Sequence, residues 1–296
     1  MHFPRYLHIL IFYIVFNINS TSQAFDKCLT LTSEYQDILD DLVSRLSTLL
    51  TLPLLSEAVS AQQRSYVTYT LSSLSQDNSP PTITLLEARN LLAAAGTTGF
   101  RTWEACLHLG TYLCSPSCAI TVTDQNILEL GAGTGYLSIL CAKHLHAAHV
   151  TVTDGSDTIV ADLASNFFLN GLQNNPVIEA KELKWGQALV SGEQTEWNQG
   201  RTVDVVLGAD VTYDSKGIPA LIATLVDLVE MFPAVKILIA ATIRNEETFE
   251  NFLKVCGMNS FAVKEIEFPV MPPKNQEGPF YSDGVPIKLC NVKKIQ

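Results

Sequence analysis

The spacing of hydrophobic residues predicts helices in the first part of the chain. From Ser33, a capping sequence of the S-x-x-Q form precedes apolar residues that recur at steps of three and four up to Leu49, and Pro53 ends this helix. A second helix is predicted over residues 56–75, followed by a loop that contains two prolines. Two short strands and a further helix complete this part, over residues 82–86, 91–95 and 102–113 respectively.

From Asn126 onward, short apolar runs alternate with stretches of helical spacing. Such alternation is typical of an α/β fold, in which helices cover both faces of a parallel sheet. Between the last two predicted strands, residues 269–284 contain four prolines and two glycines, so we expect a loop there and an antiparallel pair. The predicted strands are residues 127–130, 150–154, 177–183, 203–208, 236–242, 261–268 and 286–292. The predicted helices are residues 136–146, 157–170, 216–231 and 246–256.

Composition identifies a folded protein with an acidic surface. Apolar residues make up 47% and charged residues 17% of the 296 residues, which excludes intrinsic disorder. Asp and Glu number 30 against 19 Lys and Arg, and the net charge is −11. Nucleic acid binding needs positive charge, so nucleic acid is disfavoured as the main partner. A basic protein surface or a cationic small molecule fits this charge better.

The first residues are hydrophobic but too few to span a membrane. An apolar run at residues 7–16 follows Arg5 and precedes small residues at 22–24, an order that resembles a secretory signal peptide. A bilayer needs ~20 apolar residues, so we expect no stable membrane association. A buried helix and an incorrectly assigned gene start are the alternatives. We therefore expect a signal-like or incorrectly assigned segment, a helical extension and an α/β domain, with bounds 1–25, 26–81 and 82–296.

The strongest chemical signal is a glycine turn between a predicted strand and a predicted helix. Residues 127–136 read ILELGAGTGY. Glycine permits positive φ and a close approach of a ligand, and the free amides at the start of a helix face that ligand. A dinucleotide fingerprint, G-x-G-x-x-G, would need a third glycine where this sequence has Tyr136. A nicotinamide-dependent oxidoreductase is therefore disfavoured.

Two acidic residues lie at the ends of predicted strands. Asp154 ends the second strand of this region, where a carboxylate can accept hydrogen bonds from the ribose hydroxyls of a nucleoside. Asp210 follows the fourth strand and should face the same crevice, because ligands bind at the carboxyl ends of such strands. A helix cap is the alternative role for each acid. Arg244 and Asn245 follow the fifth strand, where contact with substrate and a position in a surface loop are equally open.

Taken together, these motifs resemble those of the S-adenosylmethionine-dependent methyltransferases. The sequence ELGAGTG, which begins at Glu129, is similar to their motif I. GTTG at 96–99, TWEA at 102–105, KW at 184–185 and ADVTY at 209–213 occur in the same order as in the seven-strand protein lysine methyltransferases of the METTL21-like superfamily. This resemblance implies a Rossmann-like seven-stranded sheet, with a class I methyltransferase domain over residues 82–296.

A more specific resemblance comes from QQRSY at residues 62–66, followed by TITLLEA and GTTGFRTWEA. These stretches are similar to the branch, in its fungal type, that methylates a lysine of translation elongation factor 2. The resemblance covers residues 35–292 and leaves out the signal-like start. It implies a cytoplasmic monomer that uses S-adenosylmethionine and acts on elongation factor 2. A location in the secretory pathway is the alternative, should the signal-like residues be real.

The resemblance also implies roles for single residues. Asp210 and Tyr213 match the D-x-x-Y motif beside the incoming lysine and are the expected catalytic residues. No metal ligand is expected. The residues expected to bind the cofactor are Trp103, Glu129, Gly131, Ala132, Gly133, Gly135, Asp154, Trp185 and Ala209.

Two other functions are compatible with the same fold. A small-molecule methyltransferase would have the same sheet, since a fold does not determine its substrate. A non-catalytic cofactor-binding protein would keep the sheet and lose the chemistry, although the intact glycine turn and D-x-x-Y motif argue against it. The seven cysteines include no C-x-x-C pair, which favours reduced thiols over zinc ligands or disulfides.

Overall fold

The computed structural model describes residues 36–51, 63–75, 80–88, 98–187, 189 and 198–295. The chain divides into two compact units, Met1–Ser60 and Ala61–Gln296. In the first unit the structure describes one helix, α3 (Gln36–Thr51), which confirms the predicted first helix over those residues. The signal-like segment and the predicted strand at 91–95 lie outside the described residues.

The second unit contains a seven-stranded sheet with the order β5-β4-β3-β6-β7-β9-β8. The first five of these strands pair in parallel, and β9 runs antiparallel to both β7 and β8. The predicted α/β fold and its antiparallel last pair are therefore confirmed. The strands are β3 (Asn126–Leu130), β4 (His149–Asp154), β5 (Ile178–Glu182), β6 (Val205–Ala209), β7 (Lys236–Thr242), β8 (Phe261–Ile266) and β9 (Ile287–Lys294).

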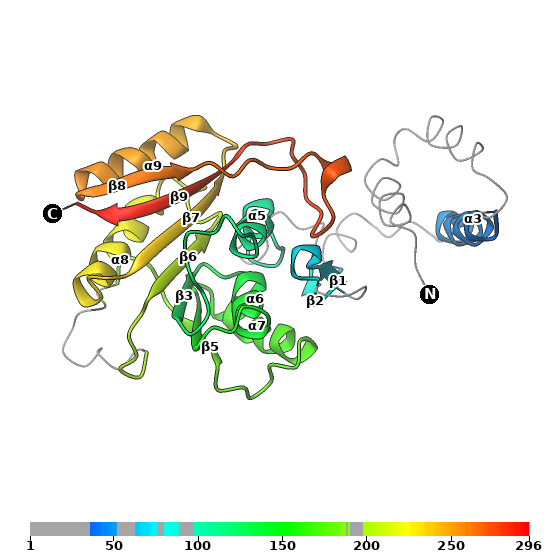
Figure 1. Cartoon of the computed structure of the whole chain (residues 1–296), viewed down its shortest axis with the longest axis horizontal. Helices are drawn as coiled ribbons and strands as arrows, with labels where there is room; N and C mark the ends of the chain where they lie inside the picture. The colour runs from blue at the N-terminus through cyan, green and yellow to red at the C-terminus, as the bar shows by residue number, and fades with distance from the viewer. Residues whose placement is uncertain are drawn as a thin grey trace. The chain divides into compact units, whose positions relative to one another are not determined.

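Helices cover both faces of this sheet, with α8 and α9 on one side and α5, α6 and α7 on the other (Figure 1). Side chains of a strand point alternately to the two faces. On β7, Leu238 and Ala240 pack in the core beneath α5, α6 and α7, whereas Ile237 and Ile239 pack beneath α8 and α9. The helices are α5 (Glu104–Leu113), α6 (Tyr136–Lys143), α7 (Asp157–Leu169), α8 (Ile218–Met231) and α9 (Glu246–Met258).

A hairpin that precedes this sheet corrects part of the sequence prediction. Strands β1 (Ser65–Thr70) and β2 (Thr82–Glu87) pair antiparallel, which confirms the predicted strand at 82–86. The predicted helix over 56–75 is wrong at β1, where the β-branched and aromatic residues of SYVTYT favour a strand. A 3-10 helix, η2 (Ser72–Leu74), follows. The three-part division of the chain stays a prediction. The part predicted as a helical extension, residues 26–81, contains strand β1, and β1 pairs with β2, which lies in the predicted methyltransferase domain.

Two asparagine side chains at the end of α7 form hydrogen bonds with the backbone amide and carbonyl groups at the outer edge of β2. The Asn166 side-chain oxygen accepts a hydrogen bond from the Leu86 amide at 2.8 Å. Asn170 accepts one from the Thr84 amide at 3.1 Å and donates one to the Thr84 carbonyl at 2.7 Å. An open strand edge would otherwise offer these groups to another chain. The asparagines therefore attach the hairpin to the helical layer of the sheet.

The connection between β8 and β9 includes a 3-10 helix, η4 (Pro273–Asn275), and packs against α5. The two ring nitrogens of His108 lie 2.9 Å from the Tyr281 hydroxyl and 2.9 Å from the Phe268 carbonyl. Burial lowers the pKa of His108 to about 4. This histidine is a buried, hydrogen-bonded packing residue.

The order of the strands indicates where a ligand binds. The chain runs outward from β3 through β4 to β5 and then returns to β6 on the other side of β3. In open α/β sheets, ligands bind outside the carboxyl ends of the strands at the point where the order reverses. A ligand site is therefore expected beyond the ends of β3 and β6.

Candidate active site

The glycine turn joins β3 to α6 and has a backbone that excludes other residues. Gly131, Gly133 and Gly135 have φ values of 65°, 54° and 80°, which favour glycine. A Cβ atom at Gly131 would lie 2.9 Å from Val211 and 3.2 Å from Trp185, and one at Gly133 would lie 3.1 Å from a backbone oxygen. The turn therefore needs glycine for its conformation and, at Gly131 and Gly133, also for space.

A cavity of about 600 Å³ opens beside this turn. A Cβ atom at Gly135 would lie 2.6 Å from Leu163 of α7, so this glycine allows the close packing of α6 and α7 and does not line the cavity. The other residues predicted for the site do line it, and they are Trp103, Glu129, Gly131, Ala132, Gly133, Asp154, Trp185, Ala209, Asp210 and Tyr213.

Asp154 links the glycine turn to the start of α7. Its carboxylate accepts hydrogen bonds from the Gly133 amide and the Ser156 amide, both at 3.1 Å. Burial raises the pKa of this carboxyl group, and the backbone hydrogen bonds oppose the rise. Asp154 thus supports the start of α7 and lines the cavity as well, so the two roles considered from the sequence are compatible.

Glu129 lies on β3 and is almost fully buried. Its carboxylate accepts hydrogen bonds from both the amide, at 2.9 Å, and the hydroxyl of Ser138. Burial raises the pKa of Glu129 to about 8, against the effect of the Ser138 hydrogen bonds and with a contribution from the charge of Asp154. Near neutral pH the carboxyl group is therefore largely protonated, and the cavity carries less negative charge than its residue types indicate.

Trp185 follows β5 and packs against Gly131. Its indole N–H is buried, and none of the described residues accepts a hydrogen bond from it. A buried donor without a partner costs ~1–3 kcal/mol. Trp185 also lines the cavity, but its N–H is covered by the protein and is not open to a molecule in the cavity.

Asp210 and Tyr213, the two residues of the D-x-x-Y motif, differ sharply in exposure. Asp210 is buried, and its carboxylate accepts hydrogen bonds from the amide and the hydroxyl of Thr242, each at 2.9 Å. Arg244 also contacts this carboxylate, at 3.5 Å. Tyr213 is 56% exposed and lines the cavity. The motif therefore combines a fixed carboxylate with an aromatic side chain that molecules in solution can reach.

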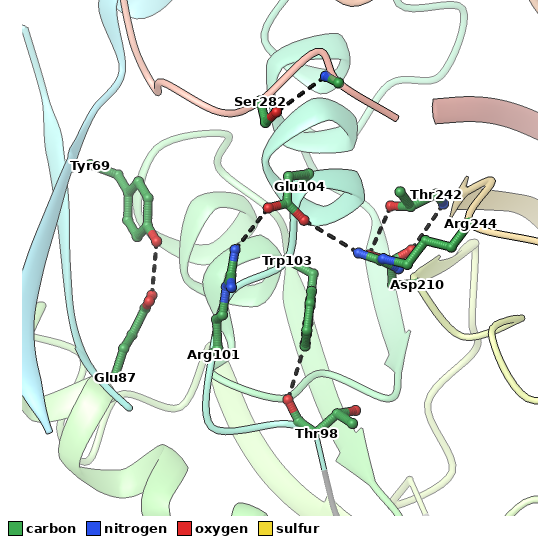
Figure 2. Close-up of polar contacts among 11 residues, drawn as sticks. Tyr69, Glu87, Thr98, Arg101, Trp103, Glu104, Asp210, Thr242, Arg244 and Ser282 are labelled. Atoms are coloured by element: carbon green, nitrogen blue, oxygen red, sulfur yellow. Dashed lines mark hydrogen bonds and ion pairs between the residues drawn. The ribbon is translucent and has the colours of Figure 1, made fainter. Parts of the chain in front are cut away.

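Trp103 lies between two arginine side chains in Figure 2. The guanidinium carbons of Arg101 and Arg244 are 4.7 and 4.8 Å from the centre of its ring, close enough for cation–π attraction. Glu104 pairs with both arginines, at 2.8 and 3.3 Å. The indole N–H donates to the Thr98 carbonyl at 3.0 Å. This arrangement fixes the indole plane at the wall of the cavity.

Buried hydroxyl groups connect the hairpin to the glycine turn. The Tyr69 hydroxyl donates to the Glu87 carboxylate at 3.0 Å, and Thr102 donates to the same oxygen at 2.6 Å. The Thr102 and Thr134 hydroxyl oxygens are 2.6 Å apart. Because Thr102 uses its proton for Glu87, Thr134 is the donor in that pair. The hairpin thus positions two threonines that line the cavity.

Some residues of the site were not predicted from the sequence. Arg101 and Glu104 flank Trp103 in a conspicuous motif, but their pairing with Arg244 depends on the fold. Thr242 ends β7 and has no motif of its own. One signal in the sequence could have found Thr242: it is a hydroxyl residue at the end of β7, and β7 pairs with β6.

Neither a metal site nor a membrane span is found within the described part of the chain. No three His, Cys, Asp or Glu side chains gather there as a set of metal ligands. Among the helices described, none is both long and apolar enough to cross a membrane.

Comparison with known proteins identifies the family. Residues 86–257 match the family described as lysine methyltransferase. The chain belongs to this lysine methyltransferase family. It is 52% identical over 261 residues to the protein-lysine N-methyltransferase EFM3 of Chaetomium thermophilum, which covers 88% of this chain and 77% of that protein.

Two further relatives of this lysine methyltransferase match a smaller share of their own length. EFM3 of Saccharomyces cerevisiae is 36% identical over 203 residues, which covers 63% of this chain and 57% of that protein. The human protein-lysine N-methyltransferase EEF2KMT is 28% identical over 222 residues, which covers 71% of this chain and 63% of that protein.

The family makes the chain an enzyme that uses S-adenosylmethionine as the methyl donor. The cavity of this lysine methyltransferase fits that cofactor, since its lining combines the glycine turn, where a Cβ atom would not fit, a carboxylate at the end of β4 and the Trp185 side chain. The non-catalytic alternative is set aside. The oxidoreductase alternative is also wrong, and Tyr136 fills the third fingerprint position as a fully buried side chain.

Proposed function

We propose that this enzyme transfers a methyl group to the side-chain nitrogen of a lysine in translation elongation factor 2. The observation that carries the proposal is that one cavity is lined by both the glycine turn and the D-x-x-Y motif, with Tyr213 exposed. A lysine on the surface of another protein can therefore reach the cavity. The relatives EFM3 and EEF2KMT, both named protein-lysine N-methyltransferases, support a protein lysine as the acceptor, and the resemblance around QQRSY supports elongation factor 2 as that protein.

The cofactor-binding roles are part of the proposal. Gly131, Ala132 and Gly133 would enclose the methionine part of S-adenosylmethionine, and Asp154 would accept hydrogen bonds from the ribose hydroxyls. Trp185 would lie beside the adenine. Trp103 would cover the cofactor at the mouth, and Ala209 would contact it through its backbone. Bound S-adenosylmethionine supplies an electrophilic methyl group on a sulfonium.

Asp210 and Tyr213 are proposed to hold the acceptor amine. Positioning two reactants can supply ~7–11 kcal/mol of the barrier reduction. The amine must also be neutral, and because a lysine in water has a pKa of ~10.4, its deprotonation costs about 4.6 kcal/mol at pH 7. Asp210 is held by Thr242 and is thus fixed in place to orient the amine, and the exposed ring of Tyr213 provides an apolar wall beside it.

Methylation of purified, unmethylated elongation factor 2 tests the proposal directly. The full-length enzyme is incubated with labelled S-adenosylmethionine and elongation factor 2, and the modified residue is identified by mass spectrometry. We expect label on a lysine of elongation factor 2. If label appears only on other proteins of a cytosolic extract, the assignment of elongation factor 2 is wrong. If only small molecules accept it, the enzyme is a small-molecule methyltransferase.

Variants separate binding of the cofactor from transfer. Asp210→Asn and Tyr213→Phe should each reduce the turnover number at least tenfold and leave the affinity for S-adenosylmethionine, measured by calorimetry, close to that of the wild type. Asp214→Asn is the matched control, because Asp214 lies next to the motif, is exposed and does not line the cavity. Equal loss of cofactor affinity in the Asp210 and Tyr213 variants would contradict these roles.

A further inference from the structure

Arg244 lies at the centre of the charged groups around the acceptor side of the cavity. Its guanidinium contacts Asp210 at 3.5 Å and Glu104 at 3.3 Å and stacks on the Trp103 ring at 4.8 Å (Figure 2). The side chain lines the cavity and is 40% exposed. One guanidinium therefore connects the candidate amine-binding carboxylate, the helix α5 and the aromatic residue at the mouth.

The charges of this group balance. Arg101 and Arg244 are positive, whereas Glu104 and Asp210 are negative, and each arginine contacts at least one of the carboxylates. Asp210 by itself would favour the ammonium form of a lysine, which cannot accept a methyl group. Arg244 opposes that effect at the same carboxylate. The pairing therefore bears directly on the reactive form of the substrate.

We propose that Arg244 is a positioning residue that acts through Asp210 and keeps the acceptor amine in its neutral, reactive form by compensating the charge of that carboxylate. This inference rests on the proposed lysine methylation and assigns a role to a residue for which the sequence left two interpretations open. Arg244 orients no leaving group and takes no proton. Its contribution is electrostatic, so it depends on charge more than on the shape of the side chain.

The other groups around the cavity do not supply the same compensation. Arg101 contacts Glu104, and Lys184 is paired with Glu182 after β5 at the other wall. Because Arg244 is 40% exposed, solvent screens part of its attraction to Asp210, and the pair contributes only modestly to stability. The titratable or charged groups that face this region are Arg101, Glu104, Cys106, Glu129, Asp154, Lys184 and Tyr213.

The pH dependence of the turnover number tests the inference. Wild type, Arg244→Gln and Arg244→Lys are compared with saturating S-adenosylmethionine and elongation factor 2. Loss of the positive charge raises the pKa of the bound amine, so the acidic limb of the Arg244→Gln profile should move upward by about one unit, limited by solvent screening. On that limb the rate falls about tenfold. At high pH it should recover to the wild-type value.

Controls distinguish charge from structure. Arg244→Lys should restore the wild-type profile, and Arg201→Gln, which removes an arginine paired with Glu179 outside the cavity, should not change it. Superimposable profiles for wild type and Arg244→Gln overturn the inference. A loss that is equal at every pH also overturns it, because that result indicates a structural role.

A second measurement needs no substrate. If the wild-type enzyme transfers no methyl group to elongation factor 2, the proposed function is wrong, and the coupling of Arg244 to Asp210 is then measured by thermal unfolding. We expect the decrease in Tm of the double variant Asp210→Asn/Arg244→Gln to be smaller than the sum of the decreases of the two single variants. Additive losses would show that the charges are not coupled, which also overturns the inference.

Discussion

Substitution of Gly131 by alanine tests whether the glycine turn is shaped for the cofactor. Gly171, which follows α7, provides a matched control because it has a φ of 71° and no atom within 4 Å of a new Cβ, against a φ of 65° at Gly131. An alanine in this left-handed region costs ~1–2 kcal/mol. Both variants bear that backbone cost, so the difference between them reports the contacts of the added methyl group.

Those contacts differ at the two positions. At Gly131 the new methyl group would lie 2.9 Å from Val211 and 3.2 Å from Trp185. Overpacking of this kind costs ~1–3 kcal/mol. The free energy of unfolding should therefore fall by about that much more for Gly131→Ala than for Gly171→Ala. Movement of Trp185 to relieve the contact would also alter the cavity wall, so affinity for S-adenosylmethionine should fall about tenfold or more.

Urea denaturation and isothermal titration calorimetry measure these two effects separately. Gly171→Ala should bind S-adenosylmethionine as the wild type does, because it lies outside the cavity lining. The reasoning is refuted if Gly131→Ala has the same unfolding free energy as Gly171→Ala and binds the cofactor as tightly as the wild type. The glycine turn would then not be needed to make room for the cofactor. Unchanged binding with a loss of stability would limit the role of Gly131 to folding.

Three single side chains give further predictions. Asp154→Ala should weaken S-adenosylmethionine binding at least tenfold by calorimetry, since hydrogen bonds to a charged group contribute ~1.5–3 kcal/mol, whereas Asp157→Ala on the exposed first residue of α7 should not. Because burial raises the pKa of Glu129 to about 8, the folded protein holds a proton there that the unfolded chain releases above pH ~4.5. Unliganded stability should therefore fall between pH 4.5 and 8, and Glu129→Gln, measured by urea denaturation across this range, should remove part of the fall. Thr102→Val should cost ~1–3 kcal/mol of unfolding free energy, because the buried Glu87 carboxylate loses a donor; an unchanged denaturation midpoint would contradict this.

Much of the sheet could be predicted because its central strands, β3, β4, β6 and β7, are buried on both faces. Strands such as β6, with the sequence VVLGA, are continuous apolar runs, and their ends are marked by glycine or acidic residues. The hairpin strand β1 was mistaken for a helix because it is a mixed polar segment whose pairing partner lies beyond a loop. Its β-branched and aromatic residues were a local signal for a strand, but its pairing with β2, and the attachment of β2 to the asparagines of α7, depend on residues far along the chain.

The site was predictable where a residue lies at the end of a strand. Asp154 ends β4 and Asp210 follows β6, and the sheet brings them to one cavity. Gly135 was assigned to the cofactor from its place in the motif, but its Cα faces Leu163 of α7. The ion pair of Glu104 with Arg244 joins residues 140 positions apart in the chain. Pairings of this kind arise from the order of strands and from helix packing, so sequence spacing alone does not predict them.

The backbone of Asp210 explains why this acid is held so firmly. Its φ of 53° lies in the left-handed region, which costs a residue other than glycine ~1–3 kcal/mol and which aspartate tolerates better than most. The Asp210 amide donates to the Ala240 carbonyl at 2.8 Å, and both polar groups of Thr242 bind its carboxylate. All of these partners belong to β7, so the pairing register of β6 with β7 sets the position of the acid. The strained turn directs the carboxylate toward β7 and leaves Tyr213, three residues later, exposed.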